Sequence, residues 1–301
     1  MDAPPELVRK LLPGVVHIHT QVPAKHPSAS LLGTERMGSG AIIDPSGLAL
    51  TVNYVVMGAE RVSVSLPQGR RLTAELLAQD FEVGLALLKI KRSGLRAVEF
   101  GASESVEPGE PVFAIASTGP QERRVSGGVV TDVGEFEAYW EYLLDRGIVS
   151  SAPNPGFGGG PLFTLDGRMI GVVSLNLNQI ARSSLAIPVE CYQGNAAELL
   201  RHGRVVSRPK RAWLGFFTYP VEEGVVVAGL VANGPGERFG LREGDLIVSL
   251  NAEEVHTRKD LFHRLWRHAP GERITLEVMR DNQVHMVEIT SGDRAEFYKL
   301  L

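Results

Sequence analysis

Two histidines stand two residues apart in an apolar stretch near the start of the chain, His17 and His19. Residues i and i+2 share one face of a strand, so the two imidazole rings could begin a metal site. A protein metal site needs three or four ligands, and the spacing of the remaining histidines and acids shows no second cluster. We therefore expect no metal and interpret the pair as part of an edge strand or of one partly buried by the opening helix.

A glycine-rich loop lies between two prolines, as Gly156–Gly160 within the stretch 155–161. Consecutive backbone N–H groups in such a loop could bind a carbonyl oxygen, as an oxyanion hole does. Each of the glycines at 158–160 loses roughly 0.5–1 kcal/mol relative to alanine on being fixed, which opposes a rigid loop. Ser39, in a Gly-Ser-Gly segment, is expected to have a structural role.

The elements that would position these groups are short strands. Glycine (33) and proline (18) make about one of every six of the 301 residues a breaker, with runs rich in Val, Ile and Leu between them. This pattern predicts closed barrels or sandwiches over the first 190 residues or so. The expected strands are 15–20, 40–43, 48–52, 61–66, 71–79, 85–90, 111–115, 127–133, 168–175 and 184–187.

Helical spacing is expected at residues 5–12, at 189–200 and at a third place. Five apolar residues there follow an i, i+3, i+4, i+7, i+8 spacing, namely Phe136, Tyr139, Trp140, Leu143 and Leu144. Their spacing predicts an amphipathic helix near the mouth of the barrel, with Glu137 and Glu141 on its solvated side. Its apolar face is either a lid packed on the same domain or a binding surface for a partner.

A basic stretch containing a proline, residues 204–212, follows the second helix and is the predicted linker between two domains. We place the first domain at 1–203, the second at 213–292 and a tail at 293–301. Strands at 224–231, 245–250, 273–279 and 283–290 alternate there with helices at 235–239 and 257–268. About eighty residues of this kind suffice for one small αβ module.

Composition excludes several classes of function. The 31 basic and 35 acidic residues give a net charge of −4 with no long run of one sign, so nucleic acid is not an expected partner. No apolar run reaches the roughly 18 residues of a membrane span. Cys191 is the only cysteine, which excludes an intrachain disulfide. The first residues lack signal-peptide features, so the protein is cytosolic or an export segment was removed, and the compartment stays open.

Several motifs resemble the HtrA/Deg family of trypsin-like serine proteases in both order and spacing. In the first domain these are GSGAIID at 38–44, LTVNYVVMGA at 50–59, the stretch 80–90, NPGFGGGPL at 154–162 and LAIP at 185–188. In the second, WLGF at 213–216 and FGLREGDLI at 239–247 resemble the carboxylate-binding loop and following strand of the family's PDZ module. The resemblance covers roughly residues 10 to 290. It implies a mostly β fold, with a trypsin-like double six-stranded β-barrel before a small αβ PDZ domain.

The departures from the family pattern concern the catalytic triad. Tyr54 stands where the family has its histidine, Gly84 where it has its aspartate, and Gly158 where it has its nucleophilic serine. A phenol with a reference pKa of about 10 is no general base at neutral pH, and glycine offers no nucleophile. Glu82 and Ser150-Ser151 form no relay without a histidine between them. The loop Gly156, Phe157 and Gly158 is then a vestigial oxyanion loop.

The PDZ-like module keeps the groups that its function needs. A PDZ groove adds a C-terminal peptide to a sheet edge and captures the terminal carboxylate with loop N–H groups. The resemblance assigns this loop to Trp213, Leu214, Gly215 and Phe216. The spacing of Leu261 and Leu265 predicts an apolar wall, and Arg211 would add positive charge near the carboxylate. The alternative is that these are only core residues of a domain with a blocked groove.

The sequence thus favours a catalytically inactive HtrA-like pseudoprotease that acts through peptide or protein binding, as a scaffold, regulator or chaperone-like protein in protein quality control. Two alternatives stay open: a hydrolase of residual or unrecognised mechanism, and a structural subunit of a larger assembly. Expected partners are C-terminal peptides or unfolded segments, with an active HtrA-like protease as a further candidate. No cofactor is expected. Residues 1–36 contain no Phe, Tyr or Trp, which puts a family-type trimer in doubt, although the family is usually extracytoplasmic.

Overall fold

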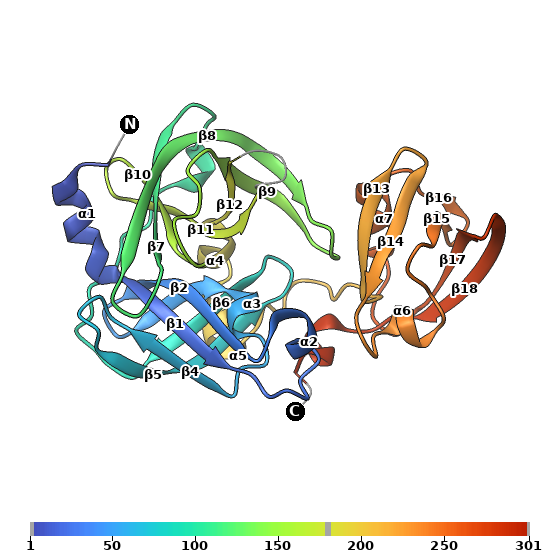
Figure 1. The fold of residues 1–301 in the computed structure, drawn as a ribbon, viewed down its shortest axis with the longest axis horizontal. Helices are drawn as coiled ribbons and strands as arrows, with labels where there is room; N and C mark the ends of the chain where they lie inside the picture. Colours follow the sequence, from blue (N-terminus) through green and yellow to red (C-terminus); the bar gives the residue numbers. More distant parts are fainter. Residues whose placement is uncertain (1–2, 178–181, 300–301) are drawn as a thin grey trace. The chain divides into compact units, whose positions relative to one another are not determined.

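The computed structural model describes residues 3–177 and 182–299, which form two compact units (Figure 1). The first unit holds Met1–Phe136 and Leu144–Val206, and the second holds Glu137–Leu143 and Ser207–Leu301. The short segment 137–143 is therefore part of the second unit, although the residues on both sides of it belong to the first.

The first barrel closes in the strand order β1-β2-β3-β6-β5-β4. Its strands are β1 (Val15–Gln21), β2 (Glu35–Asp44), β3 (Leu48–Val52), β4 (Arg61–Ser65), β5 (Arg71–Asp80) and β6 (Leu85–Ile90). Val16 and Ile18 of β1 and Leu50 of β3 are fully buried, and so are Val15 and Ala49 beside them, so both faces of these strands are covered. One turn of helix, α3 (Asn53–Val56), follows β3 directly.

The second barrel closes in the order β10-β11-β12-β9-β8-β7. Its strands are β7 (Pro111–Ser117), β8 (Arg123–Glu137), β9 (Leu143–Ser150), β10 (Pro161–Thr164), β11 (Met169–Asn176) and β12 (Ser184–Pro188). Phe113 and Phe163 stack in its core with ring centroids 5.3 Å apart. The predicted double six-stranded barrel is confirmed, with β9 and β10 as strands that the sequence patterns missed.

The remaining helices of the first unit are short. They are α1 (Pro5–Leu11), α2 (Ala29–Leu32), α4 (Glu190–Gln193) and α5 (Ala196–His202), with 3-10 turns at Leu12–Gly14 and Ser103–Ser105. The single helix expected at 189–200 is divided, because Gly194 ends α4 and α5 begins two residues later. Gly203 ends α5 with φ of +68°, a backbone region that glycine adopts without strain.

The amphipathic helix expected around Phe136–Leu144 is wrong. Strand β8 continues to Glu137 and strand β9 begins at Leu143, so the segment is the end of a β-hairpin. The acid expected in solvent, Glu141, is only 2 % exposed, while Tyr139 from the expected apolar face is 57 % exposed. The apolar spacing is helical by coincidence, because partners far along the chain decide which of these side chains are covered.

The second unit contains a sheet in the order β13-β14-β15-β17-β18, with β16 beside β15. The strands are β13 (Phe216–Val221), β14 (Gly224–Leu230), β15 (Leu246–Leu250), β16 (Glu253–Glu254), β17 (Arg273–Arg280) and β18 (Gln283–Thr290). The helices are α6 (Pro235–Arg238), α7 (Arg258–Leu265) and α8 (Arg294–Phe297). A capping box of Thr257 and Asp260 begins α7, which ends three residues before the predicted His268.

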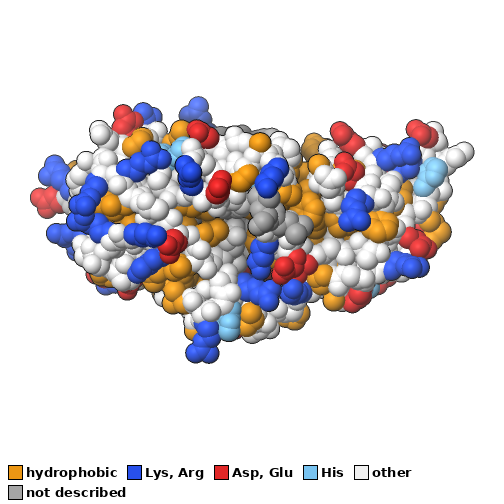
Figure 2. Space-filling view, turned by 90° about the horizontal axis from the view of Figure 1, so that it is seen from below, with side chains coloured by type: hydrophobic (Ala, Val, Ile, Leu, Met, Phe, Trp, Pro, Cys, Tyr) orange, Lys and Arg blue, Asp and Glu red, His pale blue; other side chains and the backbone are white. Residues whose placement is uncertain are grey.

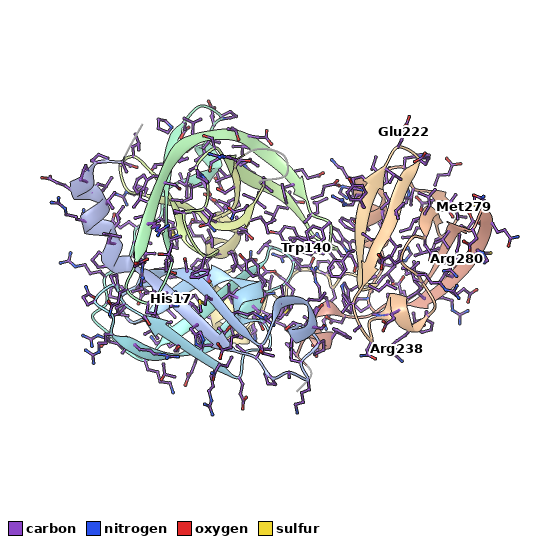
Figure 3. The ribbon with its side chains drawn as sticks, in the orientation of Figure 1. His17, Trp140, Glu222, Arg238, Met279 and Arg280 are labelled. Carbon is purple, nitrogen blue, oxygen red and sulfur yellow. The ribbon has the colours of Figure 1, made fainter. Side chains whose placement is uncertain are left out.

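A buried ion pair braces the sheet of the second unit. The guanidinium of Arg280, labelled in Figure 3, donates to both carboxylate oxygens of Asp245 at 2.6 and 2.7 Å. The Asp245 side chain has no exposed surface, so this arginine supplies the charge that its burial requires.

The surface is mixed in charge. Lysine and arginine side chains alternate with acidic ones across the face shown in Figure 2. Between residues 3 and 299, leaving out 178–181, no helix is long and apolar enough to cross a membrane.

Candidate functional site

The three positions that the resemblance assigns to the triad, Tyr54, Gly84 and Gly158, all belong to the first unit. Helix α3 places the Tyr54 phenol so that its O–H donates to the carbonyl of Ser174 at 2.9 Å. A Cβ added at Gly158 would collide with the phenol oxygen. The carbonyl of Gly84 accepts the N–H of Asn53, the first residue of α3, at 2.7 Å. At the positions that the resemblance assigns to the triad, the phenol of Tyr54 thus occupies the space beside Gly158.

The chemistry available at these positions is limited. Burial raises the pKa of the Tyr54 phenol to about 12, so the side chain stays protonated at neutral pH and acts as a hydrogen-bond donor. Gly84 has φ of +81°, a conformation in which any side chain would be strained.

The glycine-rich loop is held by hydrogen bonds from both barrels. Phe157 donates its N–H to the carbonyl of Ser117 at 2.9 Å, and Gly156 donates to the Asn154 side chain at 3.2 Å. Ser39 donates through its hydroxyl to the Phe157 carbonyl and through its N–H to the Gly158 carbonyl, both at 2.7 Å. Two of the three N–H groups of the loop 156–158 are therefore already used within the protein.

A buried chain of hydrogen bonds supports this loop, and the sequence patterns did not reveal it. His17 Nδ1 lies 3.1 Å from the Ser117 hydroxyl, which lies 3.1 Å from the Ser39 hydroxyl. Burial, followed by the charges of Arg123, His19 and Arg71, lowers the pKa of His17 to about 4, so its ring is neutral at pH 7. The three side chains are at most 3 % exposed. They position the loop rather than face a substrate.

The other candidate groups have contacts of their own. His19 approaches the exposed Glu35 carboxylate at 3.7 Å, and the described residues hold no group of three metal-ligating side chains. Glu82 lies in the turn after β5, where its N–H donates to Asp80. The hydroxyls of Ser150 and Ser151 contact Ser184 and the Val129 carbonyl, respectively.

A carboxylate lies in the predicted carboxylate-binding loop of the second unit, and it comes from Glu141. Leu214 and Gly215 each donate their N–H to this side chain at 2.8 Å, and Phe216 does so at 3.4 Å. Arg294 of α8 donates to the Glu141 carbonyl at 2.5 Å. Burial outweighs the N–H donors and the Arg294 charge, and raises the pKa of Glu141 to about 7.

The residues just before Glu141 pair with the edge of the sheet. Trp140, labelled in Figure 3, pairs antiparallel with Phe217 of β13. Thr218 donates its N–H to the Tyr139 carbonyl at 2.6 Å, and its hydroxyl donates to the same oxygen. The Tyr139 ring lies 6.0 Å from that of Phe217. Residues 139–141 thus lie along the edge strand β13, joined to it by one antiparallel bridge.

The remaining residues predicted for the groove have other contacts. Leu261 and Leu265 of α7 are fully buried in one core cluster with Leu214 and Phe216. Trp213 packs against Phe297 at 4.8 Å, away from the carboxylate. Arg211, expected near the carboxylate, instead stacks over the Trp266 ring at 4.6 Å. The cation beside Glu141 is Arg294. Arg294 belongs to residues 293–301, for which the sequence predicted only a tail.

Comparison with known proteins agrees with this architecture. Residues 38–172 match the family model of the trypsin-like peptidase domain, and residues 212–290 match that of the PDZ domain. A probable periplasmic serine endoprotease, DegP-like, from Halomonas elongata is 32 % identical over 278 residues, covering 85 % of this chain and 56 % of that protein. Its counterpart from Ectopseudomonas mendocina is 32 % identical over 293 residues, covering 90 % and 60 %.

Solved structures give the same assignment. The HtrA-type protease AlgW with a decapeptide is 26 % identical with a TM-score of 0.56, covering 96 % of this chain and 98 % of that one. The same protease with a tripeptide has a TM-score of 0.57, covering 96 % of each chain. The chain belongs to the HtrA/DegP family, whose trypsin-like domain precedes a PDZ domain. It spans somewhat over half the length of the curated relatives named above. The linker placed at 204–212 stays a prediction.

Proposed function

We propose that this chain is a non-catalytic HtrA-family protein that acts by binding peptides or proteins. The contact between Tyr54 and Gly158 carries the proposal. The phenol fills the space that a serine side chain would need, and its proton is donated to the Ser174 carbonyl.

Acyl transfer needs a nucleophile, a base that titrates near neutrality and a group that orients the base. Position 158 has no side chain, the phenol at 54 has a pKa of about 12, and Gly84 has nothing with which to orient a base. Loss of the triad leaves at most about 10³–10⁴-fold acceleration over water, from the oxyanion hole and substrate binding. With two loop N–H groups already engaged, this residual contribution is reduced further.

Peptide binding is supported by the second unit. Its loop N–H groups already hold a carboxylate, and the edge of β13 already accepts an added strand. One relative of known structure, the HtrA-type protease AlgW, is solved with a decapeptide and with a tripeptide. The ligands we propose are free C-termini and unfolded segments, with an active HtrA-type protease as a candidate client or partner for a scaffold or regulatory role.

Incubation of the purified chain with unfolded casein tests the proposal. We expect intact casein after prolonged incubation, and the same result for Gly158→Ala. Cleavage that persists through repurification would contradict the proposal and favour an unrecognised hydrolytic mechanism. Retention of the chain on immobilised free-acid peptides, with loss of retention on their amidated copies, supports the binding function.

A further inference from the structure

The groove of the PDZ module is occupied by the protein's own chain. A PDZ domain recognises a C-terminus by two contacts, capture of the carboxylate by loop N–H groups and pairing of the peptide with a sheet edge. Glu141 makes the first contact through Leu214 and Gly215. Tyr139 makes the second, because its carbonyl accepts the N–H of Thr218.

We propose that residues 139–141 are an intramolecular ligand of the PDZ groove, and that an outside C-terminus binds by displacing the Glu141 carboxylate from the loop. This inference rests on the proposed peptide-binding function and adds its regulation. Glu141 takes the place of a terminal residue, with its side-chain carboxylate standing in for a chain end.

The segment 137–141 is held in the groove by several buried contacts. Glu141 is 2 % exposed and comes from a segment 73 residues before the loop that binds it. Arg294 holds the main-chain carbonyl of the same residue. Arg258 of α7 approaches the Glu137 carboxylate at 3.5 Å and donates to the Thr218 hydroxyl at 2.9 Å, which fixes the start of the segment beside β13.

The segment is joined to the chain at both ends. When it is displaced from the groove, it therefore stays close enough to bind there again. A ligand on a short tether has an effective concentration of about 1 mM. Against an intrinsic Kd of about 10 μM for such a short ligand, the closed form then exceeds the open form by roughly 100 to 1. An outside peptide consequently binds with an apparent affinity roughly 100-fold below that of the open groove.

The displacing ligand must carry a free carboxylate that follows an extended backbone. A suitable probe copies the internal ligand: residues 135–140 followed by one valine, EFEAYWV, with a fluorophore at its N-terminus and a free C-terminus. Its amidated copy has the same side chains without the carboxylate.

The test measures binding of this probe by fluorescence anisotropy to the full chain, Glu141→Ala and Asp145→Ala. Asp145 is an exposed acid in β9, so its replacement also removes a carboxyl group but does not touch the loop. We expect at least tenfold tighter binding to Glu141→Ala, unchanged binding to Asp145→Ala, and weak binding of the amidated copy to all three proteins. Arg294→Ala, which keeps the carboxylate, provides a second opening variant and is expected to give a smaller gain.

Equal affinities of the full chain and Glu141→Ala would overturn the internal ligand while leaving peptide binding intact. If no protein binds the probe, peptide capture is contradicted, and amide hydrogen exchange at residues 214–216 decides the internal contact. Faster exchange there in Glu141→Ala than in Asp145→Ala supports the internal ligand, and unchanged exchange overturns it.

Discussion

The Tyr54 phenol occupies the space beside Gly158 that a side chain at position 158 would need. The phenol donates to the Ser174 carbonyl at 2.9 Å, and a Cβ at position 158 would meet its oxygen. The residues at 54 and 158 are therefore coupled through packing, and a serine side chain at position 158 would clash with the tyrosine.

A double-mutant cycle measures this coupling. Gly158→Ser alone should destabilise the protein by about 1–3 kcal/mol, because it overpacks a filled site. In the Tyr54→His background the same change should cost less, giving a coupling free energy of about 1–2 kcal/mol. Urea unfolding of the four proteins provides the values. Gly119→Ser is the matched control, since a Cβ there has nothing within 4 Å and should change stability by under about 0.5 kcal/mol. Additive effects would refute the shared space.

Binding of a C-terminal peptide should depend on pH through Glu141. The pKa of this side chain is about 7 in the closed groove, against an ordinary 4.5, and the charged group that faces it is Arg294 of α8. The Glu141 carboxyl binds its proton more tightly in the closed groove than in the open one. Protonation therefore stabilises the closed form fully below pH 4.5 or so, and this stabilisation is lost as the pH rises through about 7.

Apparent affinity for the EFEAYWV probe should therefore rise between pH 5 and pH 8 in the full chain. In Glu141→Ala the affinity should change little over the same range, because the probe's own carboxylate is ionised throughout. A rise of the same size in both proteins would place the titrating group elsewhere.

The buried ion pair of the second unit should dominate its stability. Arg280→Ala leaves the fully buried Asp245 carboxylate without its cation, which should destabilise the unit by about 3–5 kcal/mol. Arg273→Ala, which removes an exposed arginine 3.4 Å from Glu288 on the same sheet, should cost under about 1 kcal/mol. Comparable losses in urea unfolding would mean that Asp245 is not stabilised by its pair.

Much of the fold was predictable because the ends of strands are marked by residues next to them in the sequence. Strand-breaking residues on either side of β3 and β6 gave both strands their observed ends. The motif at 154–162 gave the position of the loop beside Tyr54. Strands β9 and β10 were missed for different reasons. Leu143 and Leu144 are both buried at the start of β9, so the strand shows no alternation there, and β10 is only four residues long.

The role of Glu141 could not be read from its neighbours in sequence. An acid opposite an apolar stripe is ordinarily a solvated residue, and here it is buried because three N–H groups 73 to 75 residues away need an acceptor. The buried set of His17, Ser39 and Ser117 escaped notice for the same reason, since its members are 22 to 100 residues apart.

The central claim, that this trypsin-like domain has no working nucleophile, is tested most directly by a serine-directed phosphonate probe followed by intact-mass spectrometry. Trypsin treated in parallel supplies the positive control for the reagent. The account predicts an unmodified mass for the whole chain after exhaustive incubation, and equally for Gly158→Ala. Stoichiometric, saturable labelling of one serine would contradict it.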